Sequence, residues 1–294
     1  MNDEYDPLLL EKQHSNEATT TCCGLGGEIL EPQQRYPIPL SLSWRIVHAL
    51  LYNTGGITFL LGSLCYFPSM TNYELGGWLF TIGAIGFLIA DLLEWYTNNR
   101  VGCFDSPLLR AEFEQKMGIY MEPKDTFLGS YQRLENGMNF FYSAIGSFLY
   151  LVGSVCFIPE TDSIVLGTEL FIVGSFVIFT SQSWKIYRQG CSNPIVVVDG
   201  TNGAKCRQDK SFSFSNYASD LPALSVDAGA GMGGLFYLIG SVYFLPEYDI
   251  TDQDTIRAAA LFTVGGWAFT LSAFSILYRY FVVRHVRYPS PENL

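Results

Sequence analysis

Ionisable side chains inside apolar stretches are the first candidates for chemistry in this chain, because a charge is costly within a bilayer. Four such residues lie in otherwise apolar segments: Asp91, Glu94, Glu169 and Lys185. Asp91 and Glu94 are three residues apart, so a helix would place them on one face. The set could form a path for protons or cations. The alternative, which we favour, is that Asp91, Glu94 and Lys185 reach the membrane interface or pair with one another.

Other patterns that could support catalysis or metal binding are weak. The histidines, His14, His48 and His285, are far apart, and no His-x-x-x-His or Cys-x-x-Cys pair occurs. The glycine-rich segment 227–234 follows no predicted strand, which argues against a dinucleotide-binding loop. The acidic segment 247–254 could bind Ca²⁺, but it lacks the Gly and the terminal Glu of an EF-hand loop. We therefore expect no enzyme activity, no cofactor and no metal.

The composition predicts a membrane protein. Of the 294 residues 49% are apolar and 15% are charged, and the segments 46–67, 138–158 and 229–246 contain no charged residue. Soluble domains average about 25% charged residues, and apolar runs of about 18 residues or more are typical of membrane spans. The net charge of −11 argues against nucleic acid as a partner, because phosphate binding requires basic surfaces.

Six segments are long enough to cross the bilayer as helices: 44–67, 75–96, 138–158, 166–187, 228–245 and 258–283. The predicted fold class is an all-α integral membrane protein with six transmembrane helices, arranged as three parallel two-helix hairpin repeats. The hairpins are 44–96, 138–187 and 228–283, and they are separated by the loops 97–137 and 188–227. A disordered tail, 1–43, precedes the first hairpin, and a second tail, 284–294, follows the third. Within the first loop, the segment 108–121 has the apolar spacing of an interfacial helix.

The distribution of basic residues predicts the orientation. Of 17 Lys and Arg residues, only Arg257 lies at a short connection between two spans of a hairpin, and these connections are rich in Asp and Glu. By the positive-inside rule, both termini and both long loops face the cytosol.

An internal repeat underlies this architecture. The residues shared by the copies are Gly62, Ser63, Pro68 and Gly83 in the first, Gly153, Ser154, Pro159 and Gly174 in the second, and Gly240, Ser241, Pro246 and Gly265 in the third. Corresponding residues are 91 apart, or 87 before the longer third tip. Glycines spaced by seven, such as Gly55 and Gly62, lie on one helix face, where small residues permit close helix packing. A gating hinge is the alternative interpretation of these glycines.

The repeat resembles the YrhK-like domain, a small two-helix membrane domain without an established biochemical activity. The resemblance rests on Gly-Ser near the end of the first helix, a short tip, and Leu-Phe-x-x-Gly-Ser on the second helix, and it is closest in the copy with Gly153–Pro159 and Leu170–Ser175. The first and third copies have Ala84 and Gly266 where the second Ser would stand. The resemblance implies the two-helix fold and no catalytic residues. The Pro-x-acid-x-x-base signature of mitochondrial carriers is absent.

The N-terminal tail contains short motifs that suggest a sorting signal. Glu4, Leu8 and Leu9 fit an acidic dileucine pattern, which resembles signals for endolysosomal or vacuolar sorting that cytosolic adaptors bind. The alternative is a plain disordered tail. Cys22 and Cys23 are candidate S-acylation sites.

The sequence thus predicts a multi-pass, non-enzymatic structural or interaction component with the lipid bilayer as its expected partner. The alternative is a transporter or channel, with a pathway between the hairpins that uses Asp91, Glu94 or Glu169. A water-filled centre would favour transport, and a dry, tightly packed centre would favour the structural role.

Overall fold

The computed structural model describes residues 42–70, 72–98, 127–191, 195–198, 205–208 and 212–282. Its main elements are six long helices: α2 (Leu42–Leu64), α3 (Tyr73–Asn98), α5 (Phe127–Cys156), α6 (Ile164–Gly190), α7 (Leu221–Tyr243) and α8 (Asp252–Leu277). Two short 3-10 helices, η3 (Pro159–Thr161) and η4 (Phe214–Asp220), precede α6 and α7, and a π-helical segment, η5 (Tyr278–Val282), continues α8.

All six helices are long and apolar enough to cross a membrane, as the sequence predicts. Even α2, with 23 residues, extends about 35 Å at about 1.5 Å per residue, against about 30 Å of hydrocarbon. All six helices begin before their predicted spans. The largest differences are at α5, which begins at Phe127 inside the expected loop 97–137, at α7, which begins at Leu221 inside the expected loop 188–227, and at α8, which begins at Asp252. The first turns of α5 include Arg133 and Glu135, so hydropathy does not detect this extension.

The connections between paired helices contain residues that stop one helix and start the next. Pro68, Pro159 and Pro246 lie shortly beyond the ends of α2, α5 and α7, where the missing N–H and the restricted preceding residue disfavour a further turn. At the start of α8, Thr251 and Asp254 form a capping box in which each side chain satisfies a backbone N–H of the other.

The expected loop 188–227 contains a short two-stranded element beside the α-helical bundle. Here β1 (Ile195–Val198) pairs antiparallel with β2 (Lys205–Gln208), with Val196 opposite Arg207. The run of three valines in β1 explains the strand, because branched side chains favour extended backbone.

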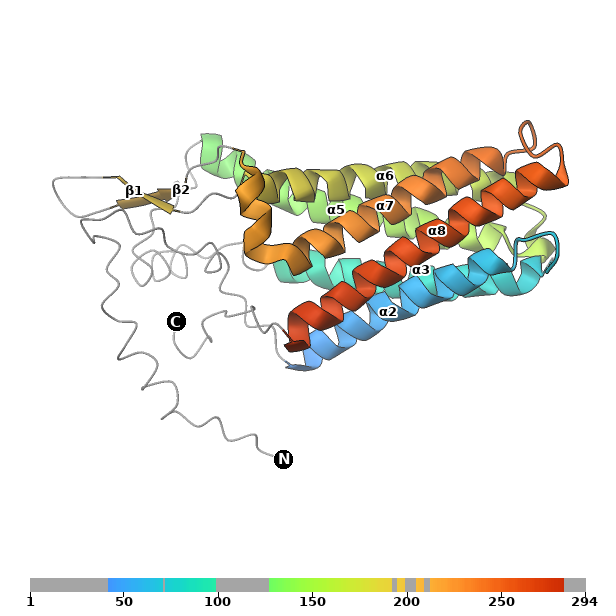
Figure 1. Cartoon of the computed structure of the whole chain (residues 1–294), viewed down its shortest axis with the longest axis horizontal. Helices are drawn as coiled ribbons and strands as arrows, with labels where there is room; N and C mark the ends of the chain where they lie inside the picture. The colour runs from blue at the N-terminus through green and yellow to red at the C-terminus, as the bar shows by residue number, and fades with distance from the viewer. Residues whose placement is uncertain are drawn as a thin grey trace, which may run out of the picture.

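The helices form a closed ring in which order in space follows order in the chain. Each helix packs against the next, and α8 returns to pack against α2. Glycines allow this closure: a Cβ on Gly266 of α8 would lie 2.6 Å from the Cα of Leu60, and one on Gly56 of α2 would lie 2.9 Å from the Cα of Thr270. The three short connections lie together at one end of the bundle, at the right in Figure 1.

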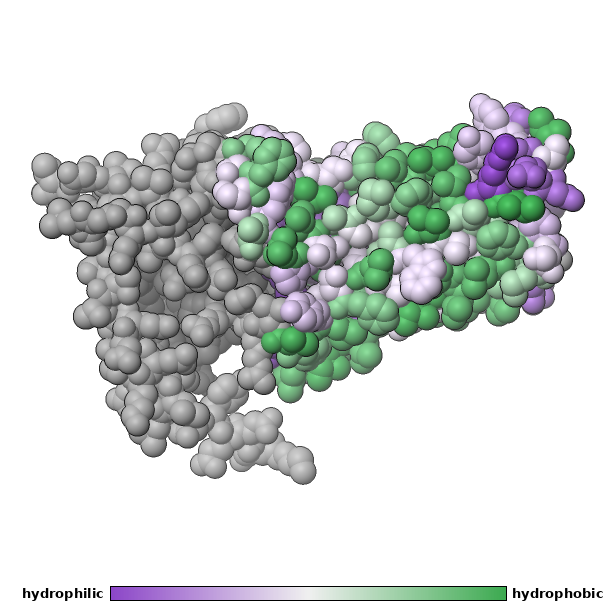
Figure 2. Space-filling view, in the orientation of Figure 1, coloured by the Kyte–Doolittle hydropathy of each residue, from purple (hydrophilic) through white to green (hydrophobic). Residues whose placement is uncertain are grey.

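The outside of the ring is apolar along the helices, and hydrophilic residues gather at the end that holds the α7–α8 connection (Figure 2). Large apolar side chains such as Leu50, Trp78, Phe176 and Leu271 are more than one-third exposed. Apolar exposure of this kind matches a surface that contacts lipid. Together with the six spans, it fits a multi-pass membrane protein.

Aromatic rings fill the axis of the ring in the half nearer the short connections. Six fully buried side chains, one from each helix, form a central aromatic cluster: Phe59, Phe80, Tyr150, Phe171, Tyr237 and Phe262. Neighbouring rings in this cluster have centroids 4.7 to 6.4 Å apart. Next to it, Tyr66, Phe157 and Phe244 contact one another pairwise, with centroids 5.7 to 6.0 Å apart. The two layers leave this half of the axis packed with side chains.

Candidate functional site

Charged and polar side chains gather inside the other half of the bundle. Glu94 of α3 lies between two cationic or potentially cationic groups: its Oε1 is 3.3 Å from His48 Nε2, and its Oε2 is 3.7 Å from Lys185 Nζ. His48 is fully buried, and the side chains of Lys185 and Glu94 are 14% and 22% exposed. The Lys185 ammonium also lies 4.9 Å from the centroid of the Phe140 ring. These contacts join α2, α3, α5 and α6.

The last described segment of the chain contacts the same cluster. The Tyr280 hydroxyl is 3.2 Å from His48 Nδ1, and Trp44 stacks on the imidazole with centroids 4.7 Å apart. Arg45 donates a hydrogen bond of 3.3 Å to the backbone oxygen of Tyr280. Residues from both ends of the described chain therefore hold His48 beside Glu94.

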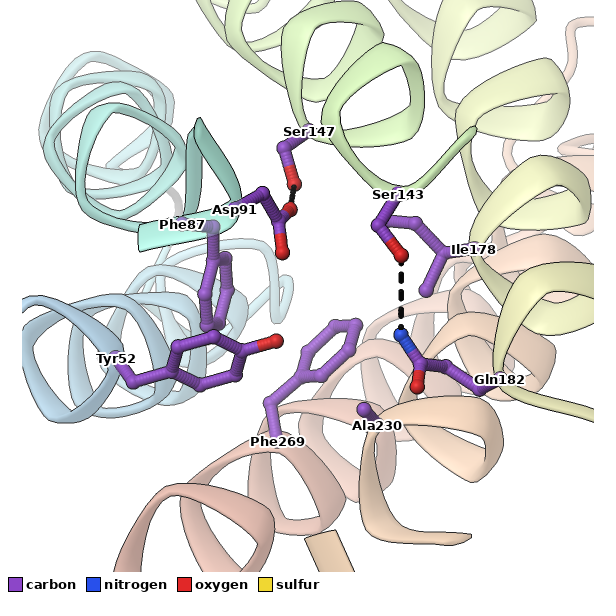
Figure 3. A pocket seen from close by; sticks show the side chains of 9 residues that line it. All are labelled: Tyr52, Phe87, Asp91, Ser143, Ser147, Ile178, Gln182, Ala230 and Phe269. Carbon is purple, nitrogen blue, oxygen red and sulfur yellow. Dashed lines mark hydrogen bonds between the residues drawn. The ribbon is translucent and has the colours of Figure 1, made fainter. Parts of the chain in front are cut away.

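One turn before Glu94 on α3, Asp91 has different surroundings. Its side chain is 4% exposed and points into the bundle (Figure 3). The Ser147 hydroxyl donates a short hydrogen bond to Asp91 Oδ2. Asp91 Oδ1 has no hydrogen-bond partner among the residues that the structure describes.

A small cavity lies beside Asp91. Its volume of about 20 Å³ leaves room for about one water molecule. The polar side chains that line it are Asp91, Tyr52, Ser143, Ser147 and Gln182, and Gln182 Nε2 donates a long hydrogen bond of 3.5 Å to Ser143 Oγ. Figure 3 shows the Tyr52 hydroxyl and the carboxylate of Asp91 directed toward this space.

The side chains at corresponding positions explain why the cavity exists. Where α2 has Tyr52, positions 91 and 87 residues further have Ser143 and Ala230. These small side chains occupy less of the axis than a second and third tyrosine would. On the side of the short connections, Phe87 and Phe269, whose rings are 5.3 Å apart, separate the cavity from the central aromatic cluster.

The structure brings together three of the four ionisable residues singled out in the sequence. Asp91, Glu94 and Lys185 lie in one interior region, with the pairing of Glu94 and Lys185 that the sequence allowed. Glu169 is exposed on the first turns of α6, near the short connection, and does not join them. A shared pathway through Asp91, Glu94 and Glu169 is therefore without structural support.

The repeat-motif glycines lie at helix contacts within each pair. A Cβ on Gly153 would lie 3.1 Å from the backbone oxygen of Gly167, and a Cβ on Gly240 would lie 3.2 Å from that of Ala258. Gly62, Gly83, Gly174 and Gly265 are likewise against side chains or backbone of the paired helix. The motif serines are fully buried: Ser63, Ser154 and Ser241.

Several further residues of the interior cluster were not predicted as site residues. They are Tyr52, Ser143, Ser147, Gln182 and Tyr280, together with His48, which was considered only as a possible metal ligand. The repeat register was the available signal, because His48 corresponds to Asn139, and Asp91 to Gln182. Polar residues at equivalent places in two copies indicate a shared interior position.

Some predictions fall outside the described residues. These are the sorting motif at Glu4, Leu8 and Leu9, the acylation candidates Cys22 and Cys23, and the interfacial segment 108–121. Within the described ranges, no group of three or more His, Cys, Asp or Glu side chains is arranged to hold a metal ion.

The comparisons with known proteins give one match, and it covers part of the chain. Residues 43–95 match the family described as YrhK-like protein, and this matched segment comprises most of α2 and α3. The resemblance is thus confirmed for the first pair of helices, whereas the sequence motifs had suggested that the second pair is closest. No curated protein and no solved structure matches the chain.

Proposed function

We propose that the protein consists of three tandem YrhK-like hairpins, of which the matched segment 43–95 is the first. The support is that residues at corresponding positions meet on one axis. Tyr66, Phe157 and Phe244, which are 91 and 87 residues apart, contact one another pairwise. Because each hairpin contains two spans, all three would insert in the same orientation, as parallel repeats about an axis along the membrane normal.

We further propose that both termini and both long loops face the cytosol. The short connections lie at one end of the bundle, and they contain Glu160, Glu247 and Asp249. The first residue of α2 and the end of η5 lie at the other end, where Arg45 bonds to Tyr280. The asymmetry of basic residues favours this second end as cytosolic.

In this orientation the protein acts as a non-enzymatic structural or interaction component of the membrane. The observation that carries this proposal is the packed half of the axis: the central aromatic cluster and the layer of Tyr66, Phe157 and Phe244 occupy the position that a transport pathway would need. The closed bundle would hold the tail 1–43 and the loops 97–137 and 188–227 at one membrane surface, where they can bind other proteins.

The proposed compartment is the endolysosomal or vacuolar membrane, with sorting adaptors as partners of the N-terminal tail. The support is the dileucine pattern of Glu4, Leu8 and Leu9 together with the cytosolic side inferred for this tail. S-acylation at Cys22 and Cys23 would add a second attachment of the tail to the bilayer.

A flux measurement tests the structural role. We expect liposomes that contain the purified full-length chain to pass sodium ions, potassium ions and protons no faster than protein-free liposomes. Variants Asp91→Asn and Phe59→Ala are measured in parallel. A flux in the wild type that Asp91→Asn abolishes would instead establish a transporter, with Asp91 in its pathway.

A further inference from the structure

Among the residues that the structure describes, Asp91 Oδ1 is a buried carboxylate oxygen without a hydrogen-bond partner. Asp91 is 4% exposed, Ser147 bonds to its Oδ2, and Oδ1 lies without a hydrogen-bond donor among the described residues. An ionised carboxylate that is withdrawn from water requires a compensating charge or hydrogen bonds. The protein groups around Asp91 supply one hydrogen bond to one of its two oxygens.

The nearby charged residues do not provide the missing counter-charge. Lys185 Nζ and His48 Nε2 are both engaged with Glu94. In the described part of the chain no cationic group lies within 4.0 Å of Asp91. From greater distance, Glu94 acts on Asp91 with one sign, and Lys185 and His48 act with the opposite sign.

The space next to Asp91 is suited to a small occupant that binds to oxygen atoms. The cavity of about 20 Å³ has room for about one water-sized particle. Tyr52 and Ser143 contribute hydroxyl oxygens to its lining, and Gln182 contributes an amide. The Tyr52 hydroxyl forms no hydrogen bond to another described residue and is directed toward the same space as Asp91 (Figure 3).

We propose that this cavity is a binding site for one small monovalent cation, with sodium as the best fit, coordinated by Asp91 and completed by the surrounding oxygens. Hard cations prefer carboxylate, carbonyl and hydroxyl oxygens as ligands. A single positive charge neutralises the single uncompensated carboxylate. A divalent cation would leave a net charge of +1 in a region of low dielectric constant, which is unfavourable.

The site would link four helices. Asp91 is on α3, Ser143 and Ser147 are on α5, Gln182 is on α6 and Tyr52 is on α2. A cation bound only by the folded arrangement therefore stabilises the fold by mass action. Phe87 and Phe269 lie between the site and the central aromatic cluster, so the site binds a cation without forming a continuous path across the bundle.

Thermal unfolding of the purified full-length chain in detergent tests this site. The melting temperature is measured by tryptophan fluorescence in sodium chloride and in choline chloride of equal ionic strength. We expect the wild type to be stabilised by sodium, with the folding equilibrium constant rising about tenfold for each tenfold increase in sodium above its Kd. Isothermal titration with sodium chloride, in a choline background, should give one bound ion for each chain.

Three variants make the test specific. Asp91→Asn keeps the shape of the side chain and should lose the sodium dependence. Glu169→Gln removes an exposed carboxylate from the same bundle and should retain the sodium dependence. If Asp91→Asn does not fold, Tyr52→Phe tests the site instead, because this variant keeps the carboxylate and removes one oxygen from the lining of the cavity. We expect it to raise the Kd for sodium about fivefold.

Equal melting temperatures of the wild type in sodium and choline would overturn the proposal and would indicate that the cavity holds water. A sodium response that persists in Asp91→Asn would also overturn it. Sodium binding is measured here without transport, so these outcomes are distinct from those of the liposome experiment.

Discussion

Asp91 and Glu94 are separated by three residues on α3, yet their carboxylates have different partners. Glu94 has Lys185 and His48 within 3.7 Å, whereas Asp91 has a serine hydroxyl and a small cavity. The difference arises from the helices opposite: α6 places Lys185 against Glu94, and α5 places Ser147 against Asp91. We assign Glu94 to the association of the helices and Asp91 to cation binding.

Replacement of Glu94 by Gln should destabilise the bundle. Lys185, 14% exposed, would keep its charge and lose its carboxylate. Breaking a fully buried ion pair costs about 3–5 kcal/mol, and we expect about 1–3 kcal/mol here because Glu94 is 22% exposed. The free energy of unfolding, or the melting temperature in detergent, is the measurement.

A double-mutant cycle supplies the control for this ion pair. Lys185→Met retains most of the apolar stem, so combining it with Glu94→Gln should recover part of the lost stability. Glu169→Gln should be close to neutral, because Glu169 is exposed. Strictly additive effects of Glu94→Gln and Lys185→Met would show that the two side chains do not interact.

Helices α5 and α6 approach one another through glycine backbones. A Cβ on Gly167 would lie 2.9 Å from the backbone oxygen of Gly153, and one on Gly174 would lie 3.2 Å from that of Gly146. Lipid provides no hydrophobic drive for helices to associate, so dispersion contacts at such close approaches stabilise the pair. The glycines therefore determine the distance between the two helices.

Gly167→Ala should destabilise the protein, while Gly231→Ala should not. The new methyl group at position 167 would overlap backbone, whereas at position 231 the nearest atom is Gln182 Cβ at 3.3 Å. Overpacking typically costs about 1–3 kcal/mol, and Ala is otherwise favoured over Gly in a helix by about 1 kcal/mol. Melting temperatures of the two variants are compared. The same change in both would exclude a specific backbone contact at Gly167.

The proposed topology of the whole bundle predicts from which side of the membrane each end of the bundle is accessible to a labelling reagent. Ser69 and Thr161 are exposed at two of the short connections, and Ser215 is exposed in η4, ahead of α7. In a chain whose native cysteines are replaced by serine, we expect Cys at positions 69 and 161 to react only from the far side and Cys at 215 only from the cytosol. Reaction of Ser69→Cys with a cytosolic reagent would disprove the six-span topology.

Sorting of the whole protein should depend on the tail and not on the bundle. Combined Leu8→Ala and Leu9→Ala changes should leave expression and membrane insertion unchanged and should move the protein from acidic organelles to the cell surface. Imaging of tagged wild type and variant provides the comparison, with Leu10→Ala as the matched control. An unchanged location of the double variant would refute the proposed address.

The sequence alone was sufficient to predict the six helices and the resemblance to the YrhK-like family. Long uncharged runs such as 46–67 require a helix in lipid, since every backbone polar group must be satisfied within the segment. The match over residues 43–95 agrees with the YrhK-like resemblance read from the glycine motifs. Helix boundaries were less predictable where a helix begins in polar sequence, as α5 does between Phe127 and Met138. There the apolar run covers only part of the hydrogen-bonded helix.

Only the tertiary structure decided which polar side chains meet and where space remains. The sequence placed Asp91, Glu94 and Lys185 in apolar spans, but contacts between α3 and α6 determine that Glu94 meets Lys185. The cavity beside Asp91 depends on side chains from several helices at once, including Tyr52, Ser143 and Gln182. Helical periodicity determines which residues share a face, whereas the neighbour of that face depends on how segments far apart in the chain pack together.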